Sequence, residues 1–247
     1  MAQFCIEIAG RVAAVTSLFD STKDYCRAYL TDKVPDYSVT VSREDLDFEQ
    51  RALLEEALEE GMKPRVFTDP FLDRAAIQRK VAEALLDHDV LLFHGSTVAV
   101  DGLAYSFTAD CGTGKSTHTR YWRQVFGDRA MMINDDKPFL KITEAGVLAC
   151  GAPWSGKHGL ETNVKLPLKG ICILHRGSEN IISPIAPEEA MAMLTKQSVA
   201  PVDPEKLPKF TYLVEKLSRS VSLWQMDCTK DPEAARISQA AMSGAAT

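Results

Sequence analysis

One stretch of the chain decides the fold: Ala109-Asp110-Cys111-Gly112-Thr113-Gly114-Lys115-Ser116-Thr117. It follows a strand-like run at residues 103 to 108 and precedes a helix-compatible segment at 115 to 126. A glycine-rich bend between a strand and a helix supplies closely spaced backbone N–H donors at the positive end of the helix dipole. The stretch therefore predicts a loop that binds the phosphates of a nucleoside triphosphate, although Ala109 stands where the strict motif has glycine.

The residue types of this loop indicate separate roles. Gly112 and Gly114 let the backbone curl tightly, Lys115 offers a positive charge to the β- and γ-phosphates, and the Ser116 hydroxyl can bind one Mg²⁺. Lys115 is thus expected to act in catalysis as well as in binding. The residues expected to contact the nucleotide are Asp110, Cys111, Gly112, Thr113, Gly114, Lys115, Ser116 and Thr117. The predicted cofactors are ATP and Mg²⁺.

A pair of aspartates, Asp135 and Asp136, ends an apolar strand-like run at residues 130 to 133. Adjacent carboxylates repel each other, and a bound cation relieves that repulsion. A phosphoryl-transfer site needs a carboxylate on a neighbouring strand, both to hold Mg²⁺ and to accept the proton of the attacking hydroxyl. The pair therefore completes a predicted phosphoryl-transfer site, whereas an isolated Asn-Asp-Asp turn would be a solvated loop.

Taken together, these motifs resemble the core of the HPr kinase/phosphorylase family. The resemblance covers roughly residues 90–185 and rests on His94-Gly95, a hairpin, the phosphate loop and the aspartate pair in that order. The loop is also similar to that of the ATP-dependent phosphoenolpyruvate carboxykinases. The resemblance implies that Asp135 is the proton-accepting base, that Asp136 holds the metal with Ser116, and that His94 faces the transferring phosphoryl group.

The chain departs from both families after the aspartate pair. The long glycine-rich signature of HPr kinases is missing from the sequence, and the matching part is too short for the oxaloacetate-handling half of a carboxykinase. A loop at residues 151 to 165 stands there instead. Its residues expected to contact the acceptor are Ser155, Gly156, Lys157, His158, Glu161 and Asn163. The open alternative is a polar crossover with Trp154 packed beneath it.

Arg176 ends the strand predicted at residues 170 to 175. A guanidinium at a strand end can stabilise the charge that develops on a transferring phosphoryl group. We therefore include Arg176 among the catalytic candidates, with a solvated surface arginine as the alternative.

The wider pattern predicts an α/β fold: a mixed-sheet phosphate-loop kinase core at residues 90–247, preceded by a small α/β region at residues 1–89. The resemblance assigns that core to the HPr kinase and phosphoenolpyruvate carboxykinase type. Asp101-Gly102 predicts a hairpin turn before the phosphate-loop strand. In the N-terminal region we expect one strand-like stretch at residues 4–15, and a helix capped by Ser42 that runs to about residue 60.

Composition excludes several classes. The chain of 247 residues has a formal net charge of −6, which argues against sequence-independent binding to nucleic acid. The sequence holds no apolar run near the ~20 residues of a membrane span and no signal-peptide pattern at its start. The 6 cysteines include no C-x-x-C pair, so neither a zinc site nor a disulfide framework is predicted. We expect a cytoplasmic protein without a membrane or nucleic-acid partner; assembly into a homo-oligomer stays open.

The predicted function is an ATP- and Mg²⁺-dependent kinase that phosphorylates a hydroxyl group. The acceptor could be a small molecule such as an amino acid, or a serine of a peptide or protein. The alternative is a non-catalytic regulatory module that binds ATP. A GTPase or motor is disfavoured because the sequence has no N-K-x-D guanine-reading segment.

Overall fold

The computed structural model describes residues 1–59, 61 and 63–244. Its contacts divide the chain into two compact units, Met1–Leu85 and Leu86–Thr247, whereas the sequence pattern suggested a division after residue 89. Each unit combines helices with its own sheet. No helix in the described ranges has the length and apolar character needed to cross a bilayer.

The first unit contains a small sheet in which β2 is central. β1 (Ala2–Ile8) and β2 (Arg11–Ser17) form an antiparallel hairpin, and β3 (Tyr37–Thr40) pairs with β2 in parallel. The single strand expected at residues 4–15 is therefore wrong. Ala9 and Gly10 adopt φ of 51° and 77°, and this left-handed pair reverses the chain.

The helices of the first unit follow this sheet. They are α1 (Asp20–Tyr25), η1 (Arg27–Tyr29), α2 (Arg43–Glu59) and α3 (Asp69–Leu85). The Ser42 Oγ accepts a hydrogen bond from the Asp45 N–H (3.4 Å), and the Ser42 N–H donates to Asp45 Oδ2 (2.9 Å), which confirms the predicted capping box of α2. The described part of α2 ends at Glu59, and the end expected at residue 60 lies outside the described residues. Asp73 on α3 is fully buried, and each of its two hydroxyl donors lies 2.6 Å away, which ties α3 to β2 and α1.

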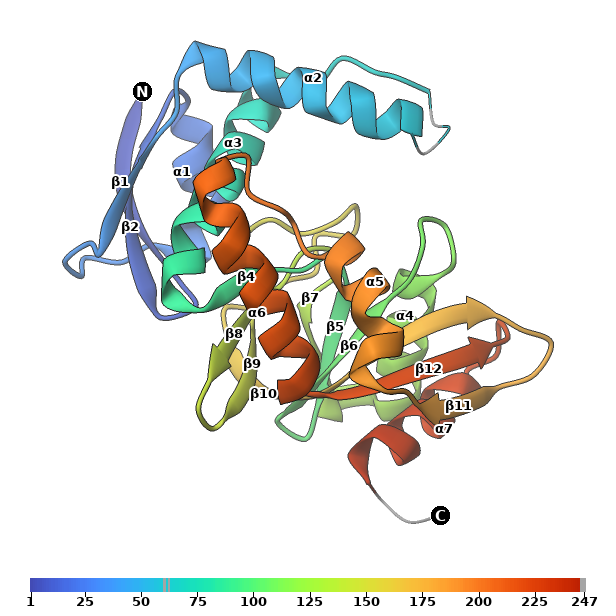
Figure 1. Cartoon of the computed structure of the whole chain (residues 1–247). Helices are drawn as coiled ribbons and strands as arrows, with labels where there is room; N and C mark the ends of the chain where they lie inside the picture. The colour runs from blue at the N-terminus through green and yellow to red at the C-terminus, as the bar shows by residue number, and fades with distance from the viewer. Residues whose placement is uncertain (60, 62, 245–247) are drawn as a thin grey trace. The chain divides into compact units, whose positions relative to one another are not determined.

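The second unit is built on a larger mixed sheet (Figure 1). Its strands are β4 (Val90–Leu92), β5 (Ser96–Val100), β6 (Leu103–Thr108), β7 (Ala130–Asn134), β8 (Phe139–Thr143), β9 (Gly146–Cys150), β10 (Lys165–Arg176), β11 (Ile181–Pro184) and β12 (Ser222–Cys228). The order is β4-β8-β9-β10-β6-β5-β7, and β12 pairs with β10 and β11. Among the described strand pairs of this sheet, only β10–β6 and β10–β12 are parallel. The predicted mixed sheet is thus confirmed.

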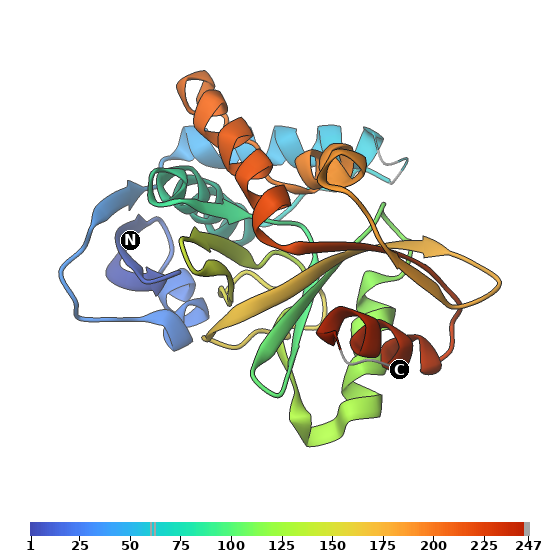
Figure 2. The ribbon, with the colours of Figure 1, turned by 60° about the horizontal axis from the view of Figure 1, so that its bottom comes forward.

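Helices cover both faces of this sheet (Figure 2). They are η2 (Leu86–His88), α4 (Lys115–Phe126), η3 (Gly127–Arg129), α5 (Pro187–Gln197), η4 (Pro204–Lys206), α6 (Leu207–Ser220) and α7 (Glu233–Ser243). Val98 and Val100 pack on the side of α4 and α7, whereas Ala99 between them packs on the side of α5 and α6. Because side chains alternate along a strand, the continuous apolar run of β5 fills two separate cores.

The strand directions bring the predicted site to one edge of the sheet. β6 and β10 are parallel, so the phosphate loop after Thr108 and the strand end at Arg176 meet at the same edge. β7 and β6 are both antiparallel to β5, which lies between them. β7 therefore ends, and β5 begins just after His94, at that edge as well. The hairpin turn is confirmed, with Asp101 and Gly102 at φ of 51° and 78°.

Candidate functional site

The predicted phosphate loop, residues 109–117, forms the expected bend between β6 and α4. Gly112 and Gly114 adopt φ of 73° and 124°, a region that L side chains rarely enter, so glycine is required at both positions. Among the described residues no side chain caps α4, which begins at Lys115. An uncapped helix start that follows a tight glycine bend offers backbone N–H donors to an anion.

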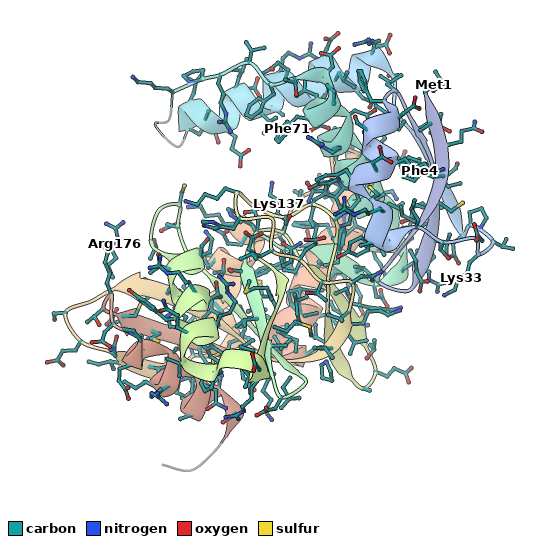
Figure 3. The ribbon with its side chains drawn as sticks, turned by 180° about the vertical axis from the view of Figure 1, so that it is seen from behind. Met1, Phe4, Lys33, Phe71, Lys137 and Arg176 are labelled. Atoms are coloured by element: carbon teal, nitrogen blue, oxygen red, sulfur yellow. The ribbon has the colours of Figure 1, made fainter. Side chains whose placement is uncertain are left out.

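Three cationic side chains, two of them from other elements, contact this loop. Lys115 Nζ donates to the Ala109 carbonyl (3.0 Å), Arg176 Nη2 donates to the Gly112 carbonyl (2.6 Å), and Lys196 Nζ pairs with Asp110 Oδ1 (2.7 Å). The hydrogen bond and charge of Lys196 hold the pKa of Asp110 below its usual value. Figure 3 shows Arg176 at the outer end of the sheet, and its hydrogen bond brings this predicted residue to the phosphate loop.

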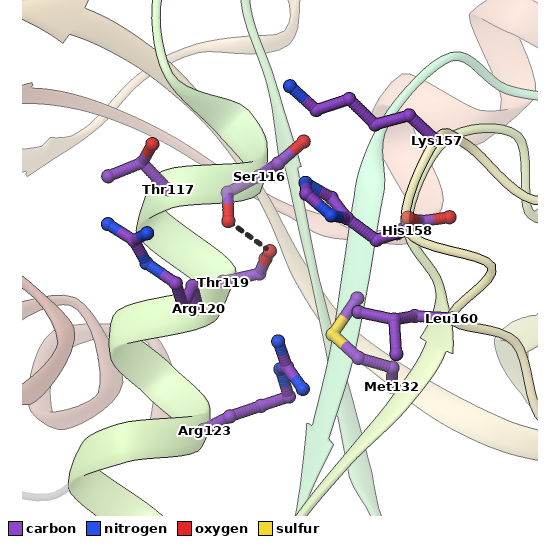
Figure 4. A pocket seen from close by; sticks show the side chains of 10 residues that line it. Ser116, Thr117, Thr119, Arg120, Arg123, Met132, Lys157, His158 and Leu160 are labelled. Atoms are coloured by element: carbon purple, nitrogen blue, oxygen red, sulfur yellow. Dashed lines mark hydrogen bonds between the residues drawn. The ribbon is translucent and has the colours of Figure 1, made fainter.

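A cavity of about 430 Å³ opens beside the amino end of α4 (Figure 4). The residues that line it come from α4, from the end of β7 and from the loop that follows β9. They are Ser116, Thr117, Thr119, Arg120, Arg123, Met132, Asp135, Lys157, His158 and Leu160. The cavity brings together the predicted metal ligand Ser116, the predicted base Asp135 and two predicted acceptor-binding residues. Its volume lies within the usual range of small-molecule sites, ~300–1,000 Å³.

Asp135 sits in the wall of this cavity opposite α4, with 7% of its surface exposed. Its Oδ1 accepts a hydrogen bond from the Gly156 N–H at 2.6 Å. Burial raises the pKa of Asp135, and the charge of Asp136 adds to this rise, while the amides of Gly156 and His158 oppose it. The result is a carboxyl group that binds a proton more tightly than an exposed aspartate does.

Asp136 and His94 lie beside this wall. His94 Nε2 is 3.5 Å from Asp136 Oδ1, and the Gly95 N–H donates to the Asp136 carbonyl (2.9 Å). Neither Asp136 nor His94 is among the described residues that line the cavity, so the geometry does not join Asp136 to Ser116. A Cβ placed on Gly156 would lie 3.1 Å from the Asp136 Cβ and 3.3 Å from both Asp135 carboxylate oxygens. Both aspartates therefore pack against Gly156.

Only part of the loop after β9 lies where the predicted contacts to the acceptor require it. Gly156 contacts the aspartate pair, and Lys157 and His158 line the cavity. The described lining residues do not include Ser155, Glu161 or Asn163. Instead, residue 161 forms a β-bridge with Asn134. This half of the loop acts as an added strand segment that holds the rest of the loop against β7.

Asn134 positions both the aspartate turn and the loop, a role that the sequence did not reveal. It is fully buried, and its Oδ1 accepts from the N–H groups of Asp136 (2.9 Å) and Lys137 (2.7 Å). Its Nδ2 donates to the carbonyls of Ala152 (3.2 Å) and Trp154 (3.1 Å). One amide thus uses four hydrogen bonds to fix two segments that are distant in sequence.

Arg120 and Arg123 are cavity residues that sequence reasoning also missed. Both follow Ser116 and Thr119 at helical spacing, and Figure 4 shows them on the same wall as these hydroxyl residues. The available signal was this spacing, because Arg120 is four residues after Ser116 and Arg123 four residues after Thr119. The sequence alone gave no reason to choose this face of α4 over the face that carries Trp122, which is buried.

Comparison with known proteins leaves the chain without an assigned family. No family model matches the sequence, and no curated protein matches it. A search of solved structures finds similarity to the HPr(Ser) kinase/phosphatase from Coxiella burnetii, with 12% sequence identity and a TM-score of 0.29. The match covers 52% of this chain and 93% of that one. At this TM-score the similarity carries no argument about the site.

Proposed function

We propose that this protein is an ATP- and Mg²⁺-dependent kinase that transfers the γ-phosphoryl group to a hydroxyl acceptor. The observation that carries the proposal is the single cavity lined by both Ser116 and Asp135. Ser116 belongs to the phosphate loop, and Asp135 is a buried carboxyl whose pKa is raised. A kinase needs these two groups on opposite sides of the reacting phosphoryl group.

The oxygen donors Ser116 and Asp135 line one cavity and are of the kind that a magnesium nucleotide needs, whereas Asp136 stands outside the described lining. Mg²⁺ prefers oxygen ligands, and the Ser116 hydroxyl and the aspartate pair are the candidates for holding it, with Asp136 as the expected carboxylate. When bound, the metal neutralises phosphate charge and orients the triphosphate. Lys115 starts the helix at the phosphate loop and is proposed to contact the β- and γ-phosphates. Arg176 donates to the Gly112 carbonyl and is proposed to steady the loop and the developing charge.

Asp135 is the proposed general base. Its raised pKa brings it closer to working pH than an ordinary aspartate, so it accepts a proton more effectively. The attacking hydroxyl forms a new bond to the γ-phosphorus, the bond to the bridging oxygen of ADP breaks, and the hydroxyl proton moves to Asp135. His94 is proposed to orient Asp136, which it approaches at 3.5 Å.

The test is acceptor-dependent release of ADP. The protein is incubated with ATP, Mg²⁺ and separate pools of hydroxyl amino acids, sugars and serine peptides. We expect one pool to stimulate ADP release, and Asp135→Asn to lower kcat by about 10²–10⁴-fold with nucleotide affinity kept. Asp128→Asn, an exposed aspartate on η3, is the matched control and should behave like the wild type. Tight ATP binding with no turnover in any pool would instead indicate a non-catalytic module.

A further inference from the structure

The cavity beside the phosphate loop extends along α4 beyond the expected position of the triphosphate. Ser116, Thr119, Arg120 and Arg123 all line it, so two full turns of the helix form one wall. Arg123 is eight residues after Lys115, which places it about 12 Å further along the axis at ~1.5 Å per residue. The phosphates are expected at the amino end of the helix. The distal part of the cavity therefore offers space for a second molecule beside the nucleotide.

The distal part of the cavity is cationic. Arg120 and Arg123 line it from α4, whereas Lys157 lies at the end of the cavity near Ser116 (Figure 4). The cavity as a whole has these three cations against the single carboxylate of Asp135. Within the described ranges no carboxylate pairs with any of these three cations, although most other arginines that the structure describes in this unit have an acidic or carbonyl partner. Arg120 lies over the ring of its neighbour Tyr121 at 5.5 Å, which leaves its N–H groups available.

Arg123 gives the sharper signal. Its Nε is buried and makes no hydrogen bond to any described residue. Figure 4 shows its guanidinium pointing from α4 across the cavity toward the wall that carries Met132. A guanidinium donor held out of water without an acceptor is costly, and a carboxylate or phosphate satisfies it with two parallel hydrogen bonds. The guanidinium of Arg123 is therefore suited to bind an anionic oxygen group.

We propose that the acceptor of this kinase is a small hydroxyl compound that also carries an anionic group, either a carboxylate or a phosphate. This inference rests on the proposed function. The hydroxyl lies near Asp135, and the anionic group binds Arg123 and Arg120 on the opposite wall. Lys157, from the loop, adds charge on the acceptor side. The arginines select and position the acceptor, and Asp135 alone takes its proton.

Equilibrium binding to protein saturated with Mg²⁺ and a non-hydrolysable ATP analogue tests this directly. Saturation fills the phosphate loop, so that a second anion cannot bind there, and the arginine variants then show whether it binds in the remainder of the cavity. The probes are matched: glycerol as the neutral compound, glycerate as the carboxylate and glycerol 3-phosphate as the phosphate. We expect at least one anion to bind about tenfold or more tightly than glycerol. The two anionic arms distinguish a carboxylate acceptor from a phosphate acceptor.

Arg123→Gln should remove this preference and leave the affinity for the ATP analogue within about twofold. Arg120→Gln, at an exposed position, should weaken the same anion by a smaller factor and covers the case in which the first variant folds poorly. Arg236→Gln, an exposed arginine of α7 paired with Glu233, is the control. Equal binding of glycerol and both anions, no binding of either anion, or an unchanged preference in both arginine variants would overturn the proposal.

These outcomes separate the two proposals. If the wild-type protein binds anions no better than glycerol but releases ADP with a neutral acceptor, the proposed kinase stands and only the proposed acceptor class is wrong. Anion binding that depends on Arg123, combined with no ADP release from any acceptor, would keep the anion site and remove the kinase.

Discussion

The two walls of the cavity are built by different means. On one wall, α4 presents Ser116, Thr119, Arg120 and Arg123 from consecutive turns of a single helix. On the other, Asp135 stands at the end of β7 and is held by backbone amides of a loop 21 residues away in sequence. The helix wall therefore follows from local geometry, whereas the loop wall depends on long-range contacts. We expect damage to the helix wall to affect mainly binding, and damage to the loop wall to affect mainly turnover and stability.

After Asp135→Asn, the next largest effect should come from breaking the helix wall where it meets the phosphates. Lys115→Ala removes the cation that starts α4 at the phosphate loop, and we expect kcat/KM for ATP to fall by about 10²–10³-fold. Steady-state kinetics with varied ATP measures this. Lys206→Ala, which removes a partly exposed lysine on η4 that pairs with Asp87, should stay within about twofold. A comparable loss in both variants would show that Lys115 has no special role.

Gly156→Ala should disturb the loop wall because its added methyl group would crowd the aspartate pair. The new Cβ would lie 3.1 Å from the Asp136 Cβ and 3.3 Å from both Asp135 oxygens, so the aspartates must shift by a few tenths of an ångström. Because a small displacement of a catalytic group is costly, we expect kcat to fall by about tenfold while the KM for ATP changes little. An unchanged kcat would mean that the aspartates do not depend on this contact.

Asn134→Ala tests the long-range contacts of the loop wall through stability. It leaves the Ala152 and Trp154 carbonyls and two turn amides without their partner, so we expect a loss of about 1–3 kcal/mol in the free energy of unfolding. Denaturant titration measures this loss. Asn180→Ala removes a part-buried amide side chain that accepts from Thr229 (2.9 Å), and should cost less than about 1 kcal/mol. Equal losses of stability in the two variants would show that Asn134 contributes no more than an ordinary part-buried amide.

The smallest expected effect is a pH-dependent change in stability that comes from Asp135 on the loop wall. A carboxyl whose pKa is raised by folding favours the folded state below its unfolded pKa of ~3.9, and this contribution is lost as pH rises through the folded pKa. Since burial raises the pKa of Asp135, ionised Asp135 destabilises the fold at neutral pH. Asp135→Asn should therefore have a higher Tm than the wild type near pH 8, with a difference that shrinks toward about pH 4. Thermal unfolding at several pH values measures it, and a difference independent of pH contradicts it.

The contrast between the walls also explains what the sequence could reveal. The phosphate loop, the helix after it and the turn at Asp101-Gly102 were predictable because glycine spacing and apolar period act over a few residues. The end of β7 was predicted to within one residue, whereas β10 begins at Lys165, five residues before the strand expected at 170 to 175. The turn at Ala9-Gly10 was missed although Gly10 was its signal, because both flanking segments are apolar and read as one strand.

The loop wall was only partly predictable. Gly156, Lys157 and His158 were expected near the acceptor, but the role of Asn134 depends on carbonyls 18 and 20 residues further along the chain. No local pattern encodes such a contact. Arg123 had the opposite difficulty: its helical position was clear, but which face of α4 meets the cavity depends on how the helix packs on β5, β6 and β7.

The most direct test is a crystal structure with Mg²⁺ and a non-hydrolysable ATP analogue bound. We expect the triphosphate to bind along Gly112 to Ser116, with the metal on the Ser116 hydroxyl and the γ-phosphate entering the cavity that Asp135 lines. A triphosphate bound elsewhere, or a γ-phosphate that points out of this cavity and away from Asp135, would contradict the proposed kinase site.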